Sequence, residues 1–191
     1  MSLLELFVLA VCLAMDAFSV SVCGSLALAP ESRMRGALRF GIWFGFFQFL
    51  MPLIGFLAAF QARGYIEAYD HWIAFFLLNY IGITMIRESR DYSCEGIKPL
   101  DKYSNREMLL MAVATSIDAL AVGVSFAFLA VDLWTSSIMI GVVTFALSFL
   151  GGMVGFRLGE RFRGYAELVG GGVLCLIGLK ILLEHLGYIT W

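Results

Sequence analysis

Charged residues are scarce in this chain of 191 residues, because aspartate, glutamate, lysine and arginine together make up only 15%. A typical soluble domain contains about a quarter. Proline occurs 3 times, and the 4 cysteines form no Cys-x-x-Cys pair. These shortages exclude an ordinary water-soluble enzyme and a disulfide-rich scaffold. No basic patch interleaved with aromatic residues is present either, so we expect no nucleic-acid partner.

Hydrophobic sequence is abundant by contrast, at 61% of the residues, with 20 glycines and 17 phenylalanines. This excludes disorder. Crossing the hydrocarbon of a bilayer takes about 20 apolar residues in a helix, whereas barrel strands would alternate over short segments. The sequence therefore predicts an all-α polytopic membrane protein. Six transmembrane helices are expected, at residues 3–29, 40–60, 71–86, 108–131, 133–156 and 166–186.

Lysine and arginine are distributed unevenly between the predicted loops. The side of the membrane that holds the second and fourth loops has only Arg63, and Lys180 lies inside the sixth span. The first, third and fifth loops contain the others: Arg33, Arg35, Arg39, Arg87, Arg90, Lys98, Lys102, Arg106, Arg157, Arg161 and Arg163. Basic loops are retained in the cytoplasm. We therefore predict that these three loops are cytoplasmic and that both termini lie outside.

The four cysteines divide between spans and loop. Cys12, Cys23 and Cys175 fall in predicted spans, and Cys94 falls in the third loop. We interpret them as buried structural thiols, because free cysteine is among the most buried residue types.

The chain contains an internal repeat. Residues 15–22 and 117–124 share Asp-Ala followed by valines four and six residues after the aspartate, at an offset of 102 residues. Residues 49–56 resemble 149–156, and residues 81–88 resemble 177–184. Each copy holds three spans, and because three is odd, the second copy enters the membrane from the opposite side.

The sequence thus predicts two inverted-topology repeats of three helices within one membrane domain, an arrangement found in many secondary transporters. The first repeat covers residues 1–90 and the second covers residues 107–191. A charged cytoplasmic linker, residues 91–106, connects them.

Pro52 and the pair Gly151-Gly152 occupy matching places in the second and fifth spans. Proline removes a backbone donor and kinks a helix, and paired breaks in two halves indicate a midplane binding site. We therefore interpret these residues as helix breaks that serve gating. The spacing of Gly151 and Gly155 fits close helix packing equally well, and both interpretations stay open.

Asp16 and Asp118 lie near the middle of the first and fourth spans, at equivalent positions. A charge at the bilayer centre costs about 2.5–3.5 kcal/mol per residue on insertion scales. We therefore interpret the pair as a functional site rather than as a helix contact. An isolated aspartate there would stay protonated, and a cation held between the two would reverse this.

Polar neighbours extend the candidate site. Ser19 shares a helix face with Asp16, and Thr115 shares one with Asp118. Gln48 lies in the second span. Carboxylate, hydroxyl and amide oxygens suit a hard or borderline divalent cation such as Mn²⁺ or Mg²⁺.

The interpretation of these neighbours differs from residue to residue. Gln48 and Asn79 fit a ligand role and a packing role equally. The hydroxyls of Ser19, Thr115, Ser125 and Ser148 are expected to bond backbone carbonyls, as is common in membrane helices. Lys180 is a possible counter-ion to an aspartate, or it extends its ammonium outward.

Several motifs together resemble the manganese efflux pump family, which groups with the LysE-type exporters. The motifs cover residues 15–18, 46–48, 51–55, 71–75, 114–119, 166–167 and 177–182. The resemblance implies a multi-pass exporter of Mn²⁺ in the bacterial inner membrane, with Asp16 and Asp118 on the metal path. It also implies that Gln48 stands where other members have glutamate or glutamine. Ile83-Thr84 departs from the glycine and basic residue of many members, so a counter-ion role would fall to Lys180 alone.

The predicted function is export of Mn²⁺ by proton-coupled alternating access, without an enzymatic reaction and without a cofactor. An exporter of another divalent metal or of amino acids is the alternative. A more remote one is an intramembrane aspartyl protease, but Met15 and Ile117 precede the aspartates where such proteases have Tyr-Asp and Gly-x-Gly-Asp motifs. The sequence does not indicate an oligomeric state.

Overall fold

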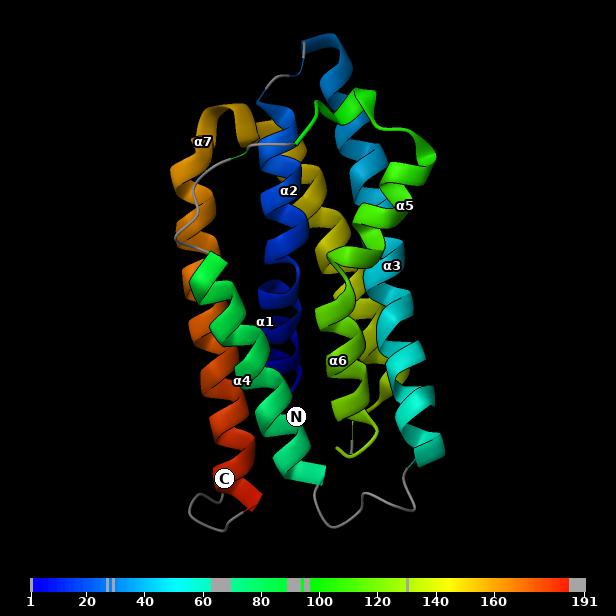
Figure 1. Ribbon diagram of the computed structural model, residues 1–191, viewed down its shortest axis with the longest axis vertical. Helices are drawn as coiled ribbons and strands as arrows, with labels where there is room; N and C mark the ends of the chain where they lie inside the picture. Colours follow the sequence, from blue (N-terminus) through cyan, green and yellow to red (C-terminus); the bar gives the residue numbers. More distant parts are fainter. Residues whose placement is uncertain are drawn as a thin grey trace.

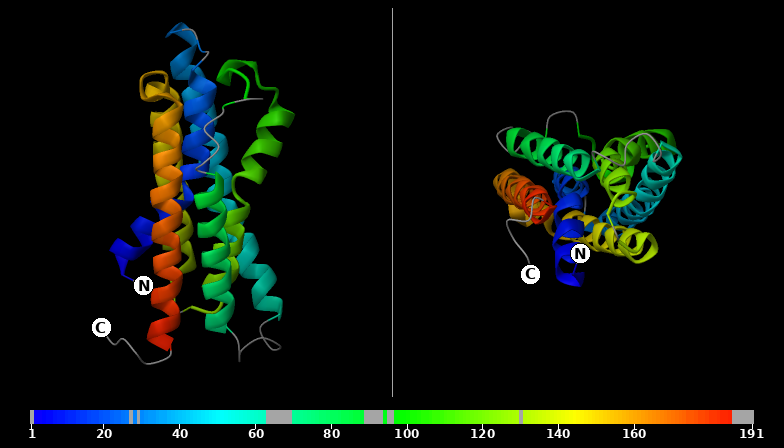
Figure 2. Two further views of the ribbon diagram at one scale, coloured as in Figure 1. Left: turned by 60° about the vertical axis from the view of Figure 1, so that its left-hand side comes forward. Right: turned by 90° about the horizontal axis from the view of Figure 1, so that it is seen from below.

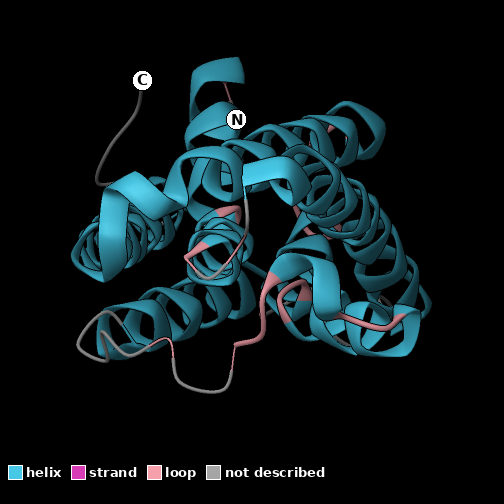
Figure 3. Cartoon of the chain, turned by 90° about the horizontal axis from the view of Figure 1, so that it is seen from above, coloured by secondary structure: helices cyan, strands magenta, loops and turns pink. Residues whose placement is uncertain are grey.

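The computed structural model describes residues 2–26, 28, 30–62, 70–88, 94, 97–129 and 131–185. Its α-helices (Figure 1) are α1 (Leu3–Leu13), α2 (Met15–Ser25), α3 (Arg33–Ala62), α4 (Asp70–Glu88), α5 (Asn105–Ala114), α6 (Ile117–Phe126) and α7 (Leu133–His185). The short 3-10 helices η1 (Pro30–Ser32) and η3 (Leu100–Lys102) precede α3 and α5. The described residues contain no strand, as Figure 3 shows from above, and this confirms the predicted all-α class.

Two capping boxes start the helices α1 and α5. The Ser2 hydroxyl accepts a hydrogen bond from the Glu5 backbone N–H, and the Glu5 carboxylate accepts one from the Ser2 N–H. Ser104 and Glu107 form the same pair of bonds 102 residues later. Each box satisfies N–H groups that the first helical turn leaves without a partner.

Length and composition identify three described segments as candidate membrane spans, Leu3–Ser25, Arg33–Phe60 and Leu133–Gly155, and a fourth if α5 and α6 form one bent span. Shorter apolar helices cover Phe75–Arg87 and Leu168–Leu183, where the third and sixth spans were predicted. Phe46 and Val142 turn more than half of their surface outward, as contact with lipid requires. The chain is an all-helical membrane protein, and the number of six spans stays a prediction.

The predicted fifth and sixth spans form one uninterrupted helix, α7. Figure 1 shows that α7 crosses the molecule, bends over at the end near η1 and runs back in the opposite direction. The predicted fifth loop, between residues 156 and 166, is therefore helical. This stretch contains no proline, so no residue there removes a helical hydrogen-bond donor.

The connections lie at two opposite ends of the molecule. The α2–α3 connection, η3 and the bend of α7 lie at one end, while α1 starts and α7 finishes toward the other (Figures 1 and 2). The predicted loop residue Arg63, part of the predicted linker and the predicted span edges at residues 29 and 186 lie outside the described residues.

Glycine allows α3 and the first half of α7 to cross closely. A Cβ atom on Gly45 would lie 2.9 Å from the carbonyl oxygen of Gly141, and one on Gly141 would lie 3.0 Å from that of Gly45. Large side chains form the core of the described residues. Phe40 and Phe44 are fully buried against α5, and Leu9 is buried among side chains of α1, α6 and α7.

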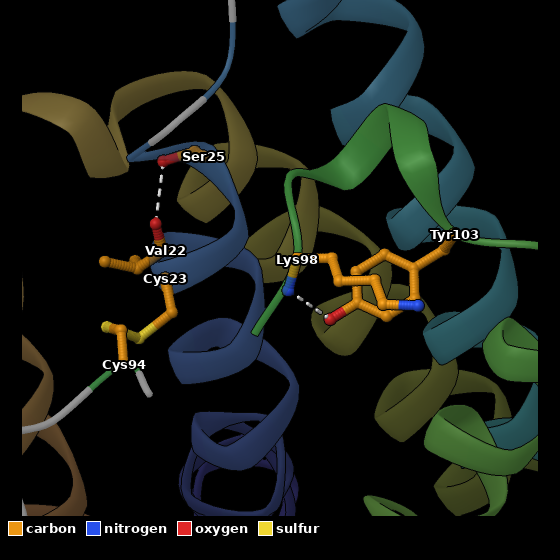
Figure 4. The surroundings of a disulfide bond; sticks show 6 residues. All are labelled: Val22, Cys23, Ser25, Cys94, Lys98 and Tyr103. Carbon is orange, nitrogen blue, oxygen red and sulfur yellow. Dashed lines mark hydrogen bonds between the residues drawn. A yellow bond between two sulfur atoms is a disulfide. The ribbon is translucent and has the colours of Figure 1, made fainter. Parts of the chain in front are cut away.

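The linker packs against the bundle through Tyr103. Its ring contacts Phe40 at a centroid separation of 5.6 Å. Arg39 Nη1 donates a hydrogen bond to the Tyr103 carbonyl at 2.7 Å, and the Lys98 backbone N–H donates one to the Tyr103 hydroxyl at 2.9 Å (Figure 4). The described residues of the linker are therefore fixed to the start of α3.

A disulfide between Cys23 and Cys94 joins the last turn of α2 to the linker (Figure 4). The interpretation of these two residues as buried structural thiols was wrong. They are 71 residues apart, and cysteine pairing cannot be deduced from sequence, since it depends on how the linker folds back over the bundle. Cys12 and Cys175 are free thiols, and Cys12 is buried, in agreement with the prediction.

Candidate functional site

The first and fourth predicted spans are broken near their centres. Helix α1 ends at Leu13 and α2 begins at Met15, while α5 ends at Ala114 and α6 begins at Ile117. The two halves of the second broken span are bent by 44°. Each break separates carbonyl groups at the end of one half-helix from N–H groups at the start of the next.

Each predicted aspartate is the second residue of the half-helix that follows a break. Asp16 lies in the first turn of α2 and Asp118 in the first turn of α6. The N-terminal turn of a helix carries a partial positive charge that favours an anion. The break therefore supplies the local field that stabilises a carboxylate within the membrane.

Helices α3 and α7 stay helical through Pro52 and Gly151-Gly152, so neither helix ends there, and the predicted gating role of these residues stays a prediction. A Cβ atom on Gly123 of α6 would lie 2.2 Å from the Pro52 carbonyl oxygen. One on Gly151 would lie 3.0 Å from the Phe18 carbonyl oxygen of α2. These contacts fit the alternative interpretation, close helix packing.

Asp16 and Asp118 line one cavity of about 280 Å³ between α2, α4, α5 and α6. The two carboxylates interact electrostatically. Asp118 Oδ1 accepts a hydrogen bond from the Ala119 backbone N–H at 2.8 Å. Its Oδ2 is buried without a hydrogen-bond partner in the described part of the chain, so this oxygen is available to a ligand.

Gln48 connects the two breaks. Its side chain is fully buried, and Nε2 donates hydrogen bonds to the Leu13 carbonyl at 3.2 Å and to the Thr115 carbonyl at 3.1 Å. Both are carbonyls at the ends of broken helices. The Gln48 side chain also interacts with the Asp118 carboxyl group. Its Oε1 is buried and has no hydrogen-bond partner among the described residues. Gln48, Ser19 and Thr115 are not among the residues that line the cavity of the aspartates.

The other predicted site residues lie in different surroundings. Thr115 donates its hydroxyl to the Met111 carbonyl at 3.0 Å, so the expected backbone bond is present. Ser19 is buried one turn beyond Asp16, and its hydroxyl has no partner among the described residues. Asn79 donates to the Phe75 carbonyl at 2.9 Å and lies beside Gly178 of α7. Asn79 does not line the cavity that contains the aspartates.

Lys180 forms an ion pair with Glu5 of α1. The pair joins α1 to the final turns of α7. The sequence did not predict Glu5 as a partner, because the two residues are 175 positions apart and only the packing of α1 against α7 brings them together.

Helix α4 supplies one wall of the cavity, which the sequence interpretation missed. Its lining residues are Leu77, Tyr80, Ile81, Thr84 and Met85. Most of them follow the i, i+3, i+4, i+7 spacing of a single helix face, and this spacing was the available signal. Thr84 donates its hydroxyl to the Tyr80 carbonyl at 2.9 Å.

Comparison with known proteins identifies relatives of this chain. A family model described as "Putative manganese efflux pump" matches residues 31–182. The chain belongs to the manganese efflux pump family. This confirms the resemblance inferred from the sequence, and a family of efflux pumps means that the chain is a membrane transporter rather than an enzyme, contrary to the protease alternative.

Curated members of the manganese efflux pump family match almost the whole chain. A protein of Desulfitobacterium hafniense (strain Y51) named "Putative manganese efflux pump MntP" is 53% identical over 97% of this chain and 97% of its own length. A protein of the same name from Acetivibrio thermocellus is 49% identical over 100% of this chain and 96% of its own length. A third, from Methanobrevibacter smithii, is 45% identical over 96% and 98%. No solved structure matches the chain significantly.

Proposed function

We propose that the protein exports Mn²⁺ from the cytoplasm and that Asp16 and Asp118 bind the ion on its path. The observation that carries the proposal is that both carboxylates line one cavity at two matching helix breaks. The names of the relatives supply the metal and the direction of transport.

The charge balance of the cavity favours a divalent cation. The two carboxylates are the acidic groups of its lining, and the remaining lining residues are uncharged. Charge in the hydrocarbon region is costly unless it is compensated, and a divalent cation compensates two carboxylates at once. The Gln48 and Asp118 oxygens without partners are the hard ligands that Mn²⁺ accepts.

Six spans in two inverted repeats fit the contacts between helices. A Cβ atom on Gly82 of α4 would approach Cys175 Sγ of α7 to 2.6 Å, and one on Gly178 of α7 would approach Asn79 Nδ2 of α4 to 2.8 Å. The two contacts are equivalent, because Gly178 follows Gly82 by 96 positions and Cys175 follows Asn79 by the same 96. The breaks, the aspartates and the capping boxes recur at offsets of 101–102 residues. This recurrence supports repeats at residues 1–90 and 107–191, joined by the linker at 91–106.

Transport then proceeds by alternating access. The two repeats rock about the aspartate pair, so that the cavity opens first to one side and then to the other. Mn²⁺ displaces protons from the carboxylates on the cytoplasmic side, and protons replace Mn²⁺ on the outer side. The basic loops orient the protein in the bacterial inner membrane with both termini outside.

Flux of Mn²⁺ into proteoliposomes tests the proposal. Asp16→Asn and Asp118→Asn are each expected to lower the rate by about 100-fold, because removing one buried charge ligand costs 3 kcal/mol or more. Asp132→Asn is the matched control, since Asp132 is an exposed acid that precedes α7. Its rate should equal that of the parent protein.

Each other outcome is decisive. Undiminished flux in both variants would make the aspartates structural. Flux that does not respond to an imposed pH gradient would exclude proton coupling. A parent protein that moves Fe²⁺, Co²⁺, Cd²⁺ or an amino acid but not Mn²⁺ would replace the proposed substrate.

A further inference from the structure

Two classes of hydroxyl group are found in and beside the helices. Most donate to a backbone carbonyl three or four residues earlier: Ser21, Ser25, Thr84, Thr115, Ser116, Ser125 and Ser136. Four buried ones have no hydrogen-bond partner in the described part of the chain: Ser19, Ser137, Thr144 and Ser148. A buried hydroxyl without a partner is costly. A carbonyl of the same helix is normally within reach, so the second class calls for a specific cause.

Ser148 lies at the same height along the helix bundle as Asp16. Helix α2 and the first half of α7 run in the same direction (Figure 1). A Cβ atom on Gly155 would lie 2.7 Å from Val22 Cα, and one on Gly151 would lie 3.0 Å from the Phe18 carbonyl oxygen. Since each helix rises about 1.5 Å per residue, one turn before Gly151 brings Ser148 to the first turn of α2, where Asp16 lies.

Gln48 likewise lies at the same height along the helix bundle as Asp118. Helices α3 and α6 also run in the same direction (Figure 1), and Gly123 of α6 lies against Pro52 of α3. One turn before Pro52, Gln48 is level with the start of α6, as its bond to the Thr115 carbonyl requires. Ser148 follows Gln48 by 100 residues, the offset between the second and fifth spans.

We propose that the Ser148 hydroxyl is a ligand of the transported cation and completes a second half-site with Asp16, equivalent to Asp118 with Gln48. The proposal rests on the proposed function and adds a specificity-determining residue to it. Ser148 is fully buried and its Oγ has no partner among the described residues. A neutral hydroxyl oxygen suits a hard or borderline divalent cation. Gln48 differs in that its amide N–H groups hold the two breaks, so that only its Oε1 is left for the ion.

Binding of Mn²⁺ to purified protein in detergent tests this directly, through loss of the electron paramagnetic resonance signal of free Mn²⁺. Ser148→Ala is expected to weaken Mn²⁺ binding by about tenfold, the effect of losing one ligand bond. Ser148→Cys offers sulfur in place of oxygen. It is expected to shift the preference between Cd²⁺ and Mn²⁺ toward Cd²⁺ by about tenfold or more, because soft ligands select softer metals.

Ser125→Ala and Ser125→Cys are the matched controls. Ser125 is as buried as Ser148, but its hydroxyl donates to the Ala121 carbonyl at 3.3 Å. Both controls should bind Mn²⁺ and Cd²⁺ like the parent protein. Thermal unfolding of each variant in detergent checks that it is folded, and the Cys variants keep the test valid if Ser148→Ala unfolds.

The results separate this inference from the proposed function. If the Ser148 variants bind both metals as the Ser125 variants do, Ser148 is not a ligand, whatever the flux. If the parent protein binds Mn²⁺ and Ser148→Ala weakens that binding, but no Mn²⁺ flux occurs in proteoliposomes, the ligand role stands and the transport function fails. A parent protein that does not bind Mn²⁺ at all overturns both.

Discussion

The two broken spans, α1–α2 and α5–α6, share one plan but are held differently. Each begins with a capping box, breaks near its centre and places an aspartate just after the break. Glu5 at the start of α1 pairs with Lys180 of the distant α7, whereas Glu107 at the start of α5 pairs with Lys98 of the adjacent linker. Cys23 in α2 is held by a disulfide, whereas Ser125, 102 residues later, only bonds its own helix.

The comparison teaches that the two segments share one backbone plan while single side chains around them differ. The aspartates stay the same in both copies, but the polar residue level with each one is an amide in one half and a hydroxyl in the other.

The largest difference between the halves is expected at Gly55 and its equivalent, Gly155. A Cβ atom on Gly55 would lie 2.1 Å from the Leu120 carbonyl oxygen, which is backbone and cannot rotate away. On Gly155 the nearest atom is the Ser25 hydroxyl at 2.4 Å, which can rotate, although Val22 Cα follows at 2.7 Å. Gly55→Ala should cost about 3 kcal/mol or more and Gly155→Ala less, measured by thermal unfolding in detergent.

Gly172→Ala is the control for these substitutions, because a Cβ atom there would meet nothing within 4 Å. It should leave stability equal or slightly raised, since alanine favours the helix more than glycine does. Equal losses at Gly55 and Gly155 would mean that the two halves pack alike.

The disulfide is expected to give the next largest effect. Reduction should lower the stability of the protein by about 2–4 kcal/mol, because the bond restricts the unfolded chain across a long loop. The measurement is thermal unfolding with and without dithiothreitol, beside the double variant Cys23→Ser, Cys94→Ser. Reduction should leave the stability of the double variant unchanged. Maleimide labelling of the unfolded, unreduced protein should find the two thiols of Cys12 and Cys175, and labelling of all four cysteines would contradict the bond.

Gln48→Leu is expected to have a moderate effect on stability. It leaves the Leu13 and Thr115 carbonyls without their Gln48 donor, at a cost of about 1–3 kcal/mol. Ser148→Ala leaves no described group without a partner, so it should cost less in the same unfolding experiment. Stability unchanged by Gln48→Leu would show that Gln48 does not hold the breaks.

The smallest effect is expected from the two ion pairs. Glu5→Gln should cost more than Glu107→Gln, because the Lys180–Glu5 pair is less exposed than Lys98–Glu107, and exposed pairs contribute little. The hydrogen bond with Glu107 raises the pKa of Lys98 above its usual 10.5. The stability that a charged Lys98 contributes through this pair is therefore complete below pH 10.5. It is lost as the pH rises through the higher pKa that Lys98 has in the folded protein. Thermal unfolding measured below pH 10.5 and above the folded pKa of Lys98 checks this expectation. A loss of the stabilisation already near neutral pH would contradict it.

A good part of the site could be predicted from the sequence. Asp16 and Asp118 were identified because carboxylates are conspicuous in long apolar segments, and the repeat marked them as equivalent. The helix breaks before them were not predicted. Proline and glycine are local signals, but Pro52 and Gly151 serve close contacts here, and their helices continue. The Ser-x-x-Glu sequences that begin at Ser2 and Ser104 are a further repeated signal, of capped helix starts, at the same offset of 102 residues.

The behaviour of the hydroxyls was only half predictable. Thr115 and Ser125 bond backbone carbonyls as expected. Ser19 and Ser148 are buried without a partner in the described part of the chain. Sequence cannot separate these cases, because each hydroxyl has a carbonyl one turn earlier and its orientation depends on neighbouring helices.

The sequence by itself determined the helical membrane class, the family and the aspartate pair, because these follow from hydrophobicity, charge placement and repetition along one chain. The tertiary structure alone decided where the helices break, which cysteines pair, that Lys180 meets Glu5, and that Gln48 bonds the Leu13 and Thr115 carbonyls. The physical reason is that each of these depends on atoms brought together by helix packing, between positions from 35 to 175 residues apart, and no local pattern records such contacts.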